Sequence, residues 1–296
     1  MEITRTFVRE RLPEIKREYH KYDRGRLLVI AGSYGMAGAC IMASRAALRA
    51  GVGYLNVAVP KEIYGILAGA LPEAVFTVYE KPEDLSPAQE KADAVLLGPG
   101  LGALRDEVCP YVFREGKKPL LIDADGLNSL AEAPWNFAGR DVVLTPHEGE
   151  MARLLELPVQ TVRRDRKEAL VMAAAAYGAA VLLKGPETLV TEAIHLPPKE
   201  TGEDAEPPVI EVPEILVNHT GNPCLATAGS GDVLSGIIGA FMAGGVPARD
   251  AAAMGAYVHG LAGDLARERF GLRSARPSDV IESIPEVLRG LEMVDP

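Results

Sequence analysis

Short apolar runs, each ended by a turn residue or a polar residue, alternate along the chain with longer stretches of helical spacing. Such short runs, bounded by glycine or proline, are typical of buried strands. Because strands and helices alternate, the pattern predicts an α/β fold with a mainly parallel sheet and helices on both faces. The predicted strands cover Arg26–Ala31, Tyr54–Val59, Asp93–Leu97, Pro119–Asp123, Asp141–Thr145 and Ala180–Lys184.

Helical segments lie between most of these strands and fill the C-terminal part of the chain. The alanine-rich segment Ala37–Ala50 ends at Gly51, a residue suited to the left-handed end of a helix. Ser278 or Asp279 is a suitable N-cap for the last helix. The three predicted C-terminal helices are Gly231–Met242, Pro247–Glu268 and Ser278–Leu291.

One segment departs from the overall composition. Leu196–Glu214 holds five prolines and six acidic residues. Such a segment cannot bury enough apolar surface to fold by itself. We expect a solvated loop between two β segments, Thr188–Ile194 and Val209–Val217, within a single domain that spans residues 1–296.

Composition and charge exclude several classes of protein. With 48% hydrophobic and 24% charged residues, the chain has the balance of a soluble globular protein. Its net charge is −10, whereas proteins that bind nucleic acids carry an excess of basic residues for contact with the phosphate backbone. The longest apolar run, Val171–Leu183, is too short to span a bilayer, and Met1–Tyr22 has no apolar signal-peptide core. We expect a cytoplasmic protein without a membrane segment.

The three cysteines are Cys40, Cys109 and Cys224, and no two of them lie close in the sequence. Their number and spacing fit neither a zinc site nor a disulfide framework. We expect isolated, buried thiols.

The most informative segment reads Ala228-Gly229-Ser230-Gly231-Asp232 and is followed at once by an apolar helical run. The glycines permit backbone angles that are closed to other residues, so successive N–H groups can point at one spot. The start of the helix adds free N–H groups and the positive end of its dipole. These features predict an anion hole for a phosphate.

Asp232 has two interpretations. A carboxylate in a first helical turn is stabilised by the helix dipole and needs no further role. Beside a bound phosphate, it is also placed to take a proton from an attacking hydroxyl group, which is the task of a general base in phosphoryl transfer.

Further segments, in order along nearly the whole chain, resemble those of one enzyme family, the ADP/ATP-dependent NAD(P)H-hydrate dehydratases of the ribokinase-like superfamily. The resemblance implies a three-layer α/β/α sandwich. The matching segments are Gly25–Ala39, Leu97–Gly102, Ile122–Asn128, Leu144–Glu150, Leu183–Val190, Asn218–Gly236 and His259–Asp264.

The resemblance also implies an activity, that of a hydro-lyase acting in metabolite repair. The family restores hydrated NADH or NADPH by phosphorylating the hydroxyl group on the reduced ring, after which phosphate leaves. Bacterial members use ADP as co-substrate and eukaryotic members use ATP, with Mg²⁺. Members often form homo-oligomers, with tetramers among them. About two dozen residues before the first predicted strand are too few for an epimerase domain, so we expect none there.

Carried over by position, the family's site residues fall on segments that follow predicted strands. Asp232 resembles the catalytic base and a hydrate contact. Gly229, Ser230 and Gly231 resemble the anion hole, and Asp125 and Asn128 are additional candidates. Glu150 has two interpretations: it is a candidate to hold Mg²⁺ through water, which suits a hard cation that keeps its waters, or an acid that stabilises the first turn of a helix. The remaining implied contacts are Ala39, Gly102 and His147 to the hydrate, and Lys184, Gly185, Pro186, Glu187, Thr188 and Gly231 to the nucleotide.

Other functions compete with the one that the resemblance implies. A ribokinase-like alcohol kinase would share the anion hole and stop at the phosphorylated product. A redox enzyme is disfavoured because the glycines at 32, 35 and 38 lack the G-x-G-x-x-G spacing and no acidic residue follows the second strand at 59–61. No Walker A motif occurs either. A non-catalytic nucleotide-binding module would gain little from Asp232 beside a phosphate.

Overall fold

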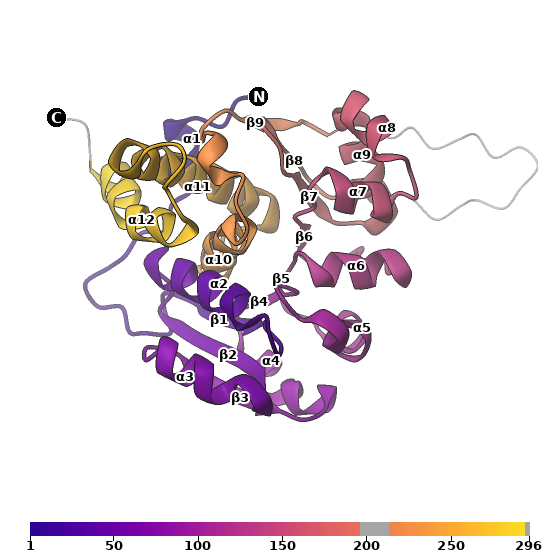
Figure 1. The fold of residues 1–296 in the computed structure, drawn as a ribbon, viewed down its shortest axis with the longest axis vertical. Helices are drawn as coiled ribbons and strands as arrows, with labels where there is room; N and C mark the ends of the chain where they lie inside the picture. The colour runs from indigo at the N-terminus through magenta and orange to yellow at the C-terminus, as the bar shows by residue number, and fades with distance from the viewer. Residues whose placement is uncertain (196–212, 294–296) are drawn as a thin grey trace, which may run out of the picture.

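The computed structural model describes residues 1–195 and 213–293. One nine-stranded sheet runs through these segments in the order β3-β2-β1-β4-β5-β6-β7-β8-β9 (Figure 1). Strands β1 to β7 pair in parallel, whereas β8 and β9 are added antiparallel. The strands are β1 Arg26–Ile30, β2 Tyr54–Pro60, β3 Val75–Tyr79, β4 Ala94–Leu97, β5 Leu120–Ile122, β6 Val142–Leu144, β7 Ala180–Leu183, β8 Thr188–Thr191 and β9 Leu216–Asn218.

Helices cover both faces of the sheet, because successive strand residues point to opposite sides. In β1, Leu27 and Val29 join one apolar core, and Leu28 and Ile30 join the other. The first face carries α1 Arg5–Arg11, α2 Ala37–Arg49, α3 Tyr64–Ala70, α10 Ser230–Ala243, α11 Ala248–Phe270 and α12 Pro277–Glu292. The second carries α4 Ser86–Lys91, α5 Arg105–Glu115, α6 Asp125–Glu132, α7 Glu148–Leu154, α8 Val159–Arg164 and α9 Arg166–Tyr177. The predicted three-layer α/β/α architecture is confirmed.

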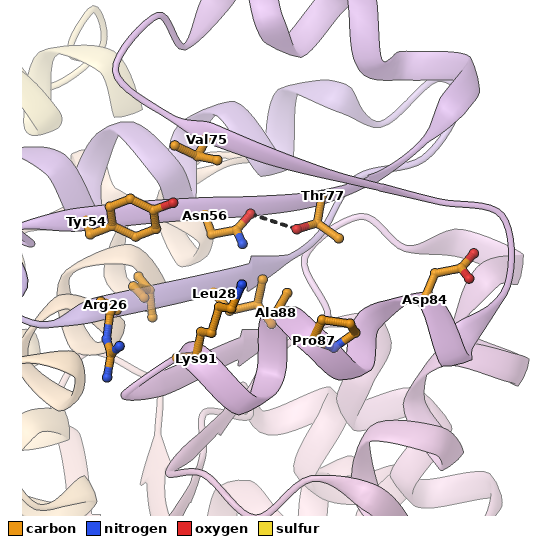
Figure 2. A pocket seen from close by; sticks show the side chains of 12 residues that line it. Arg26, Leu28, Tyr54, Asn56, Val75, Thr77, Asp84, Pro87, Ala88 and Lys91 are labelled. Atoms are coloured by element: carbon orange, nitrogen blue, oxygen red, sulfur yellow. Dashed lines mark hydrogen bonds between the residues drawn. The ribbon is translucent and has the colours of Figure 1, made fainter.

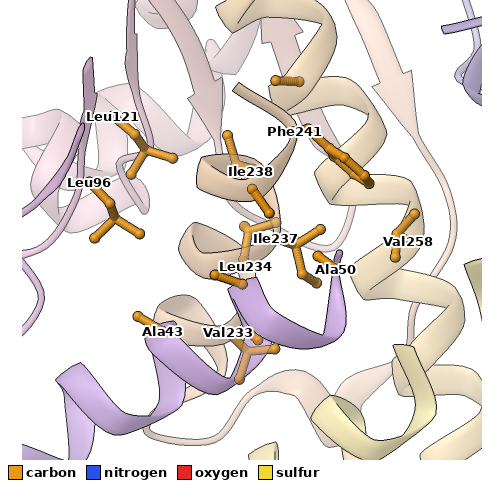
Figure 3. Packing of buried hydrophobic residues seen from close by; sticks show 14 of the residues in the cluster. Ala43, Ala50, Leu96, Leu121, Val233, Leu234, Ile237, Ile238, Phe241 and Val258 are labelled. Carbon is orange, nitrogen blue, oxygen red and sulfur yellow. The ribbon is translucent and has the colours of Figure 1, made fainter. Parts of the chain in front are cut away.

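Helix α10 lies at the centre of the first core (Figure 3). Its apolar side chains pack among α2, α11 and the strand residues Leu96 and Leu121. Gly236 permits a close approach to α2, since a Cβ there would overlap the Ala43 carbonyl oxygen and lie 2.8 Å from the Ala46 Cβ. This packing on three sides fixes where the N-terminus of α10 points.

Two elements were not predicted. Strand β3 contains Thr77 and has partly exposed side chains at the edge of the sheet, so its apolar pattern is weak. Helix α1 lies in a highly charged segment that buries only Phe7 and Val8. Both are short elements that are stabilised by contact with the rest of the fold.

Several predicted boundaries were wrong, and the β segment predicted at Thr188–Ile194, for example, ends at Thr191. The last helix has Arg276 as its N-cap and Pro277 as its first residue, while Asp279 accepts a hydrogen bond from the Arg276 N–H from within the first turn. A proline at the first helical position fixes the start of the helix one residue earlier than predicted. In the predicted β segment Val209–Val217, residues 213–215 are not in a strand and β9 begins at Leu216; the first four residues of the segment, like most of the predicted loop Leu196–Glu214, lie outside the described residues.

The three cysteines are free and buried, as predicted. None of the helices in the described segments is long and apolar enough to cross a membrane.

Candidate active site

The candidate site lies at the carboxyl ends of the parallel strands, where residues following β5, β6 and β7 meet the N-terminus of α10. In open α/β sheets this edge is where ligands bind, near the point where the strand order reverses. Here that point lies between β1 and β4.

Two ion pairs and a hydrogen bond join these elements. The Lys184 Nζ, after β7, lies 2.8 Å from the Asp123 Oδ1, after β5. The second Asp123 oxygen accepts a hydrogen bond of 2.7 Å from the Ser235 hydroxyl of α10. Glu150 Oε2 lies 3.7 Å from the same ammonium group. Burial by itself lowers the pKa of Lys184, but these carboxylates outweigh burial and raise it, so the ammonium form is held in place.

Asp232 lies in the first turn of α10, three residues before Ser235. Within the described residues its carboxylate forms no hydrogen bond, whereas both oxygens of Asp123 are engaged. Burial, and next the negative charge of Asp123, raise the pKa of Asp232 to about 6, against the opposing effect of Lys184. A carboxylate with this pKa is ionised at neutral pH and has an increased affinity for a proton.

Two glycines precede Asp232 in the predicted anion hole, and their backbone angles correct one part of that prediction. Gly229 is the N-cap of α10 and has a φ of +93°, so it needs the left-handed conformation and offers no capping side chain. Gly231, in contrast, has ordinary helical angles. The helix lies close to Lys184 here, because a Cβ at this position would be in van der Waals contact with the lysine Nζ, at 3.5 Å. The first N–H groups of α10 and one ammonium group thus lie close together.

His147 and Glu150 form the capping box of α7. The His147 Nδ1 accepts hydrogen bonds from the N–H groups of Gly149, at 2.9 Å, and Glu150, at 3.3 Å. Glu150 Oε2 in turn accepts a hydrogen bond of 2.8 Å from the His147 backbone N–H. Burial lowers the pKa of His147, so its side chain is neutral; its Nε2–H, on a side chain that is 54% exposed, lies 3.5 Å from the Glu150 Oε1.

Ala39 and Gly102 lie beside the loop that follows β4. A Cβ added to Gly100 would lie 2.9 Å from the Ala39 Cβ, and one added to Gly102 would lie 2.7 Å from the Met36 Cε. The backbone N–H of Gly102 donates to Asp125 Oδ2 at 2.8 Å.

Asp125 and Asn128 brace this region rather than facing the ion pair. Asn128 Nδ2 lies 3.3 Å from Asp125 Oδ1, and its Oδ1 accepts a hydrogen bond from Arg153 of α7. Ala124, between Asp123 and Asp125, has a φ of +50°. Such strain in a residue other than glycine is common where a chain must aim neighbouring side chains.

Lys184–Thr188 forms the turn between β7 and β8. Gly185, Pro186 and Glu187 are exposed, and Glu187 pairs with His219 Nδ1 at 3.3 Å. Lys184 alone of this segment reaches the ion pair with Asp123. The rest of the turn forms an exposed rim beside it.

Sequence reasoning missed Asp123, Ser235 and His259. Asp123 is the last residue of the predicted strand Pro119–Asp123, as Lys184 is of Ala180–Lys184, and that shared position is the signal that could have identified it. His259 lies in one of the matching segments, but the sequence assigned it no role. In the structure its Nε2 lies 3.2 Å from the Ser230 hydroxyl. Ser235 gives no sequence signal, since its importance depends on which strand end its helix packs against.

A separate cavity of about 250 Å³ lies at the amino ends of β1, β2 and β3, opposite the candidate site (Figure 2). Three of its polar side chains already have partners. Thr77 donates a hydrogen bond to Asn56 at 3.1 Å, and Arg26 forms an ion pair with Asp93. It brings together no group with the chemistry of Asp232 or Lys184.

Comparison with known proteins identifies the family. A family model described as NAD(P)H-hydrate dehydratase matches residues 27–286. The chain belongs to the NAD(P)H-hydrate dehydratase family. Among curated relatives of this family, the bifunctional NAD(P)H-hydrate repair enzyme of Moorella thermoacetica is 37% identical over 98% of this chain and 54% of the relative. The ADP-dependent (S)-NAD(P)H-hydrate dehydratase of Neisseria meningitidis is 38% identical over 86% of this chain and 81% of the relative.

The solved structures agree with this family assignment. The ADP/ATP-dependent NAD(P)H-hydrate dehydratase of Bacillus subtilis, co-crystallised with ATP and Mg²⁺, matches 98% of both chains at 26% identity with a TM-score of 0.82. A hydroxyethylthiazole kinase from Pyrococcus horikoshii, at 18% identity and a TM-score of 0.56, shares the fold alone. The chain spans about half the length of the bifunctional relatives it matches.

Proposed function

We propose that this chain is an ADP-dependent (S)-NAD(P)H-hydrate dehydratase, a hydro-lyase that returns hydrated NADH or NADPH to the intact cofactor. The observation that carries the proposal is the half-buried Asp232 carboxylate, which has no hydrogen bond within the described residues and sits at the mouth of α10 beside Lys184. Family membership supplies the substrate class.

In this proposal the nucleotide binds with its terminal phosphate at the start of α10. The N–H groups after Gly229 and the Lys184 ammonium group stabilise the phosphate oxygens. Gly229, Ser230 and Gly231 form the anion hole, and the turn Lys184–Thr188 borders the rest of the nucleotide. An ammonium group already held by Asp123 needs little reorganisation to meet the negative charge of the transition state.

Asp232 then acts as the general base. It takes the proton of the ring hydroxyl as that oxygen attacks the terminal phosphorus, and the bond from phosphorus to the departing nucleotide oxygen breaks. Hydroxide is a poor leaving group, but phosphate is a good one. Phosphate leaves with the ring carbon–oxygen bonding pair, the ring nitrogen assists, and loss of a proton from the adjacent carbon restores the double bond.

The hydrated dinucleotide would lie against Ala39 and Gly102 on one side and His147 on the other. Ala39 and Gly102 permit close approach because they are small. The Nε2–H of His147 would turn from the Glu150 Oε1, 3.5 Å away, to donate to a polar group of the substrate. The hydrate contacts are therefore van der Waals at the β4 loop and a hydrogen bond at α7.

Mg²⁺ fits this site only as a mostly hydrated ion. Among the described residues no group of three or more histidine, cysteine and acidic side chains could hold a metal. Glu150 Oε1, which does not accept the hydrogen bond of the His147 N–H, would contact the ion through water. The ion would neutralise phosphate charge.

We further propose that residues 1–296 act as one cytoplasmic domain and assemble as a homo-oligomer, with a tetramer as the expectation from the family. The free, buried cysteines suit a reducing compartment. The exposed apolar residues Ile66, Val75 and Val78 near the β3 edge support self-association.

The test is to incubate the protein with hydrated NADH and either ADP or ATP and to follow the absorbance of the reduced nicotinamide ring. We expect recovery of absorbance, with one phosphate and one AMP released per ring when ADP is used. An alcohol kinase would consume nucleotide without recovery. No recovery with either nucleotide would contradict the proposal.

A further inference from the structure

A buried histidine of α11 contacts Ser230, a residue of the proposed anion hole. His259 lies within α11 and is 8% exposed, and Ser230, the first residue of α10, is 4% exposed. The His259 Nε2 and the Ser230 Oγ are 3.2 Å apart. The contact joins two helices at the point where α10 presents its free N–H groups.

The imidazole of His259 is neutral. Burial, and next the positive charge of Lys184, lower the pKa of His259 to about 4. A neutral imidazole has one N–H donor and one acceptor nitrogen, so the contact can take two forms. Either Nε2–H donates to the serine oxygen, or the serine hydroxyl donates to Nε2.

The two forms have opposite effects on a bound phosphate. If the serine donates to the imidazole, its oxygen lone pairs face the anion site and repel the phosphate. If Nε2–H donates, the serine proton is free to turn toward the phosphate and to add an O–H donor to the backbone N–H groups. The nearby Lys184 ammonium and helix dipole attract anions to this place, so the second form is the one compatible with a bound phosphate.

We propose that His259 is a positioning residue, which donates Nε2–H to Ser230 and so aims the Ser230 hydroxyl proton at the terminal phosphate of the nucleotide. The inference rests on the proposed function, since it requires that phosphate to bind at the mouth of α10. His259 itself touches neither substrate.

The decisive experiment compares the binding of ADP with that of AMP, which lacks the terminal phosphate. By isothermal titration, Ser230→Ala and His259→Phe should each weaken ADP binding by roughly tenfold, the effect of one hydrogen bond to a charged group, and leave AMP binding unchanged. His259→Gln keeps an N–H donor and should recover most of the loss. The double variant Ser230→Ala with His259→Phe should lose no more than either single variant, because both remove the same hydrogen bond.

A second measurement uses the unaltered protein, so it stands even where a variant fails to fold. With ¹⁵N-labelled histidine, the His259 ring in the ADP complex should carry its proton on Nε2. A proton on Nδ1, additive losses in the double variant, or equal losses of ADP and AMP affinity would each overturn the inference. Wild-type protein that binds ADP no better than AMP would instead refute the proposed function.

Discussion

The Lys184 ammonium and the Asp123 carboxylate lie 2.8 Å apart, although 61 residues separate them in the chain. The pair ties β7 to β5, and the Ser235 hydroxyl on the same carboxylate ties both to α10. The buried Asp123 carboxylate therefore ties the ends of β5 and β7 to the first turns of α10.

Removing one partner of this pair should be costly. Lys184→Met leaves Asp123, which is 1% exposed, as an unpaired buried carboxylate, and we expect a loss of about 3–5 kcal/mol in unfolding free energy. Urea denaturation measures the change. The double variant Lys184→Met with Asp123→Asn should regain part of that stability without regaining ADP affinity. A single variant as stable as wild type would show that the pair is not buried in solution.

Asp232→Asn separates catalysis from binding. We expect turnover of hydrated NADH to fall by roughly 10²–10⁴-fold, because an amide cannot accept the hydroxyl proton. Affinity for ADP, measured by titration calorimetry, should hold or increase, since a negative charge beside the phosphate is removed. Turnover close to that of wild type would eliminate Asp232 as the base.

Activity should rise with pH through the titration of Asp232. Below a pH of about 6 its carboxyl group is protonated and cannot act as a base. The profile of kcat/KM against pH should therefore show an acidic limb near that value. An acidic limb near pH 4 would mean that burial does not raise the pKa of Asp232.

The same raised pKa makes a prediction about stability. The folded state binds more protons than the unfolded state between the ordinary pKa of 3.8 and about 6, so Asp232 lowers stability as pH rises through this window. Wild type and Asp232→Asn should be similar in stability near pH 4, and the variant should be the more stable at pH 7. Thermal unfolding at both pH values measures the difference.

A pair of glycine variants tests the close packing of α10 on α2. Gly236→Ala should destabilise the fold by about 1–3 kcal/mol, because the new methyl group overlaps the Ala43 carbonyl oxygen. Gly69→Ala, in α3, places its methyl group in open space and should be neutral or stabilising by up to about 1 kcal/mol. Chemical denaturation of the two variants compares them. Equal effects would mean that α2 and α10 can move apart freely.

Much of the fold could be predicted because its strands are buried on both faces. Continuous apolar runs such as those of β1 and β4, ended by glycine, identify parallel strands without knowledge of their neighbours. Strand β3 could not be predicted in this way, because it lies at an edge and its residues are stabilised only by pairing with β2. The start of α12 was misplaced because two suitable capping residues stand within its first turn.

The candidate site was predicted in part. Lys184 and Asp232 were found from their positions after a strand and at a helix start, and the structure brings both to one place. Gly102 stays a predicted hydrate contact, and the structure shows that its backbone N–H donates to Asp125. Asp123 and His259 received no role, since their partners are 61 and 29 residues away.

The sequence by itself determined the alternation of strands and helices, the glycine-lined start of α10 and the acid in its first turn, because these depend on local backbone conformation and on which side chains avoid water. Only the tertiary structure decided which side chains form ion pairs and hydrogen bonds with one another. That choice depends on the order of strands in the sheet and on the packing of α10 between α2 and α11, and contacts across such distances leave no local pattern in a single chain.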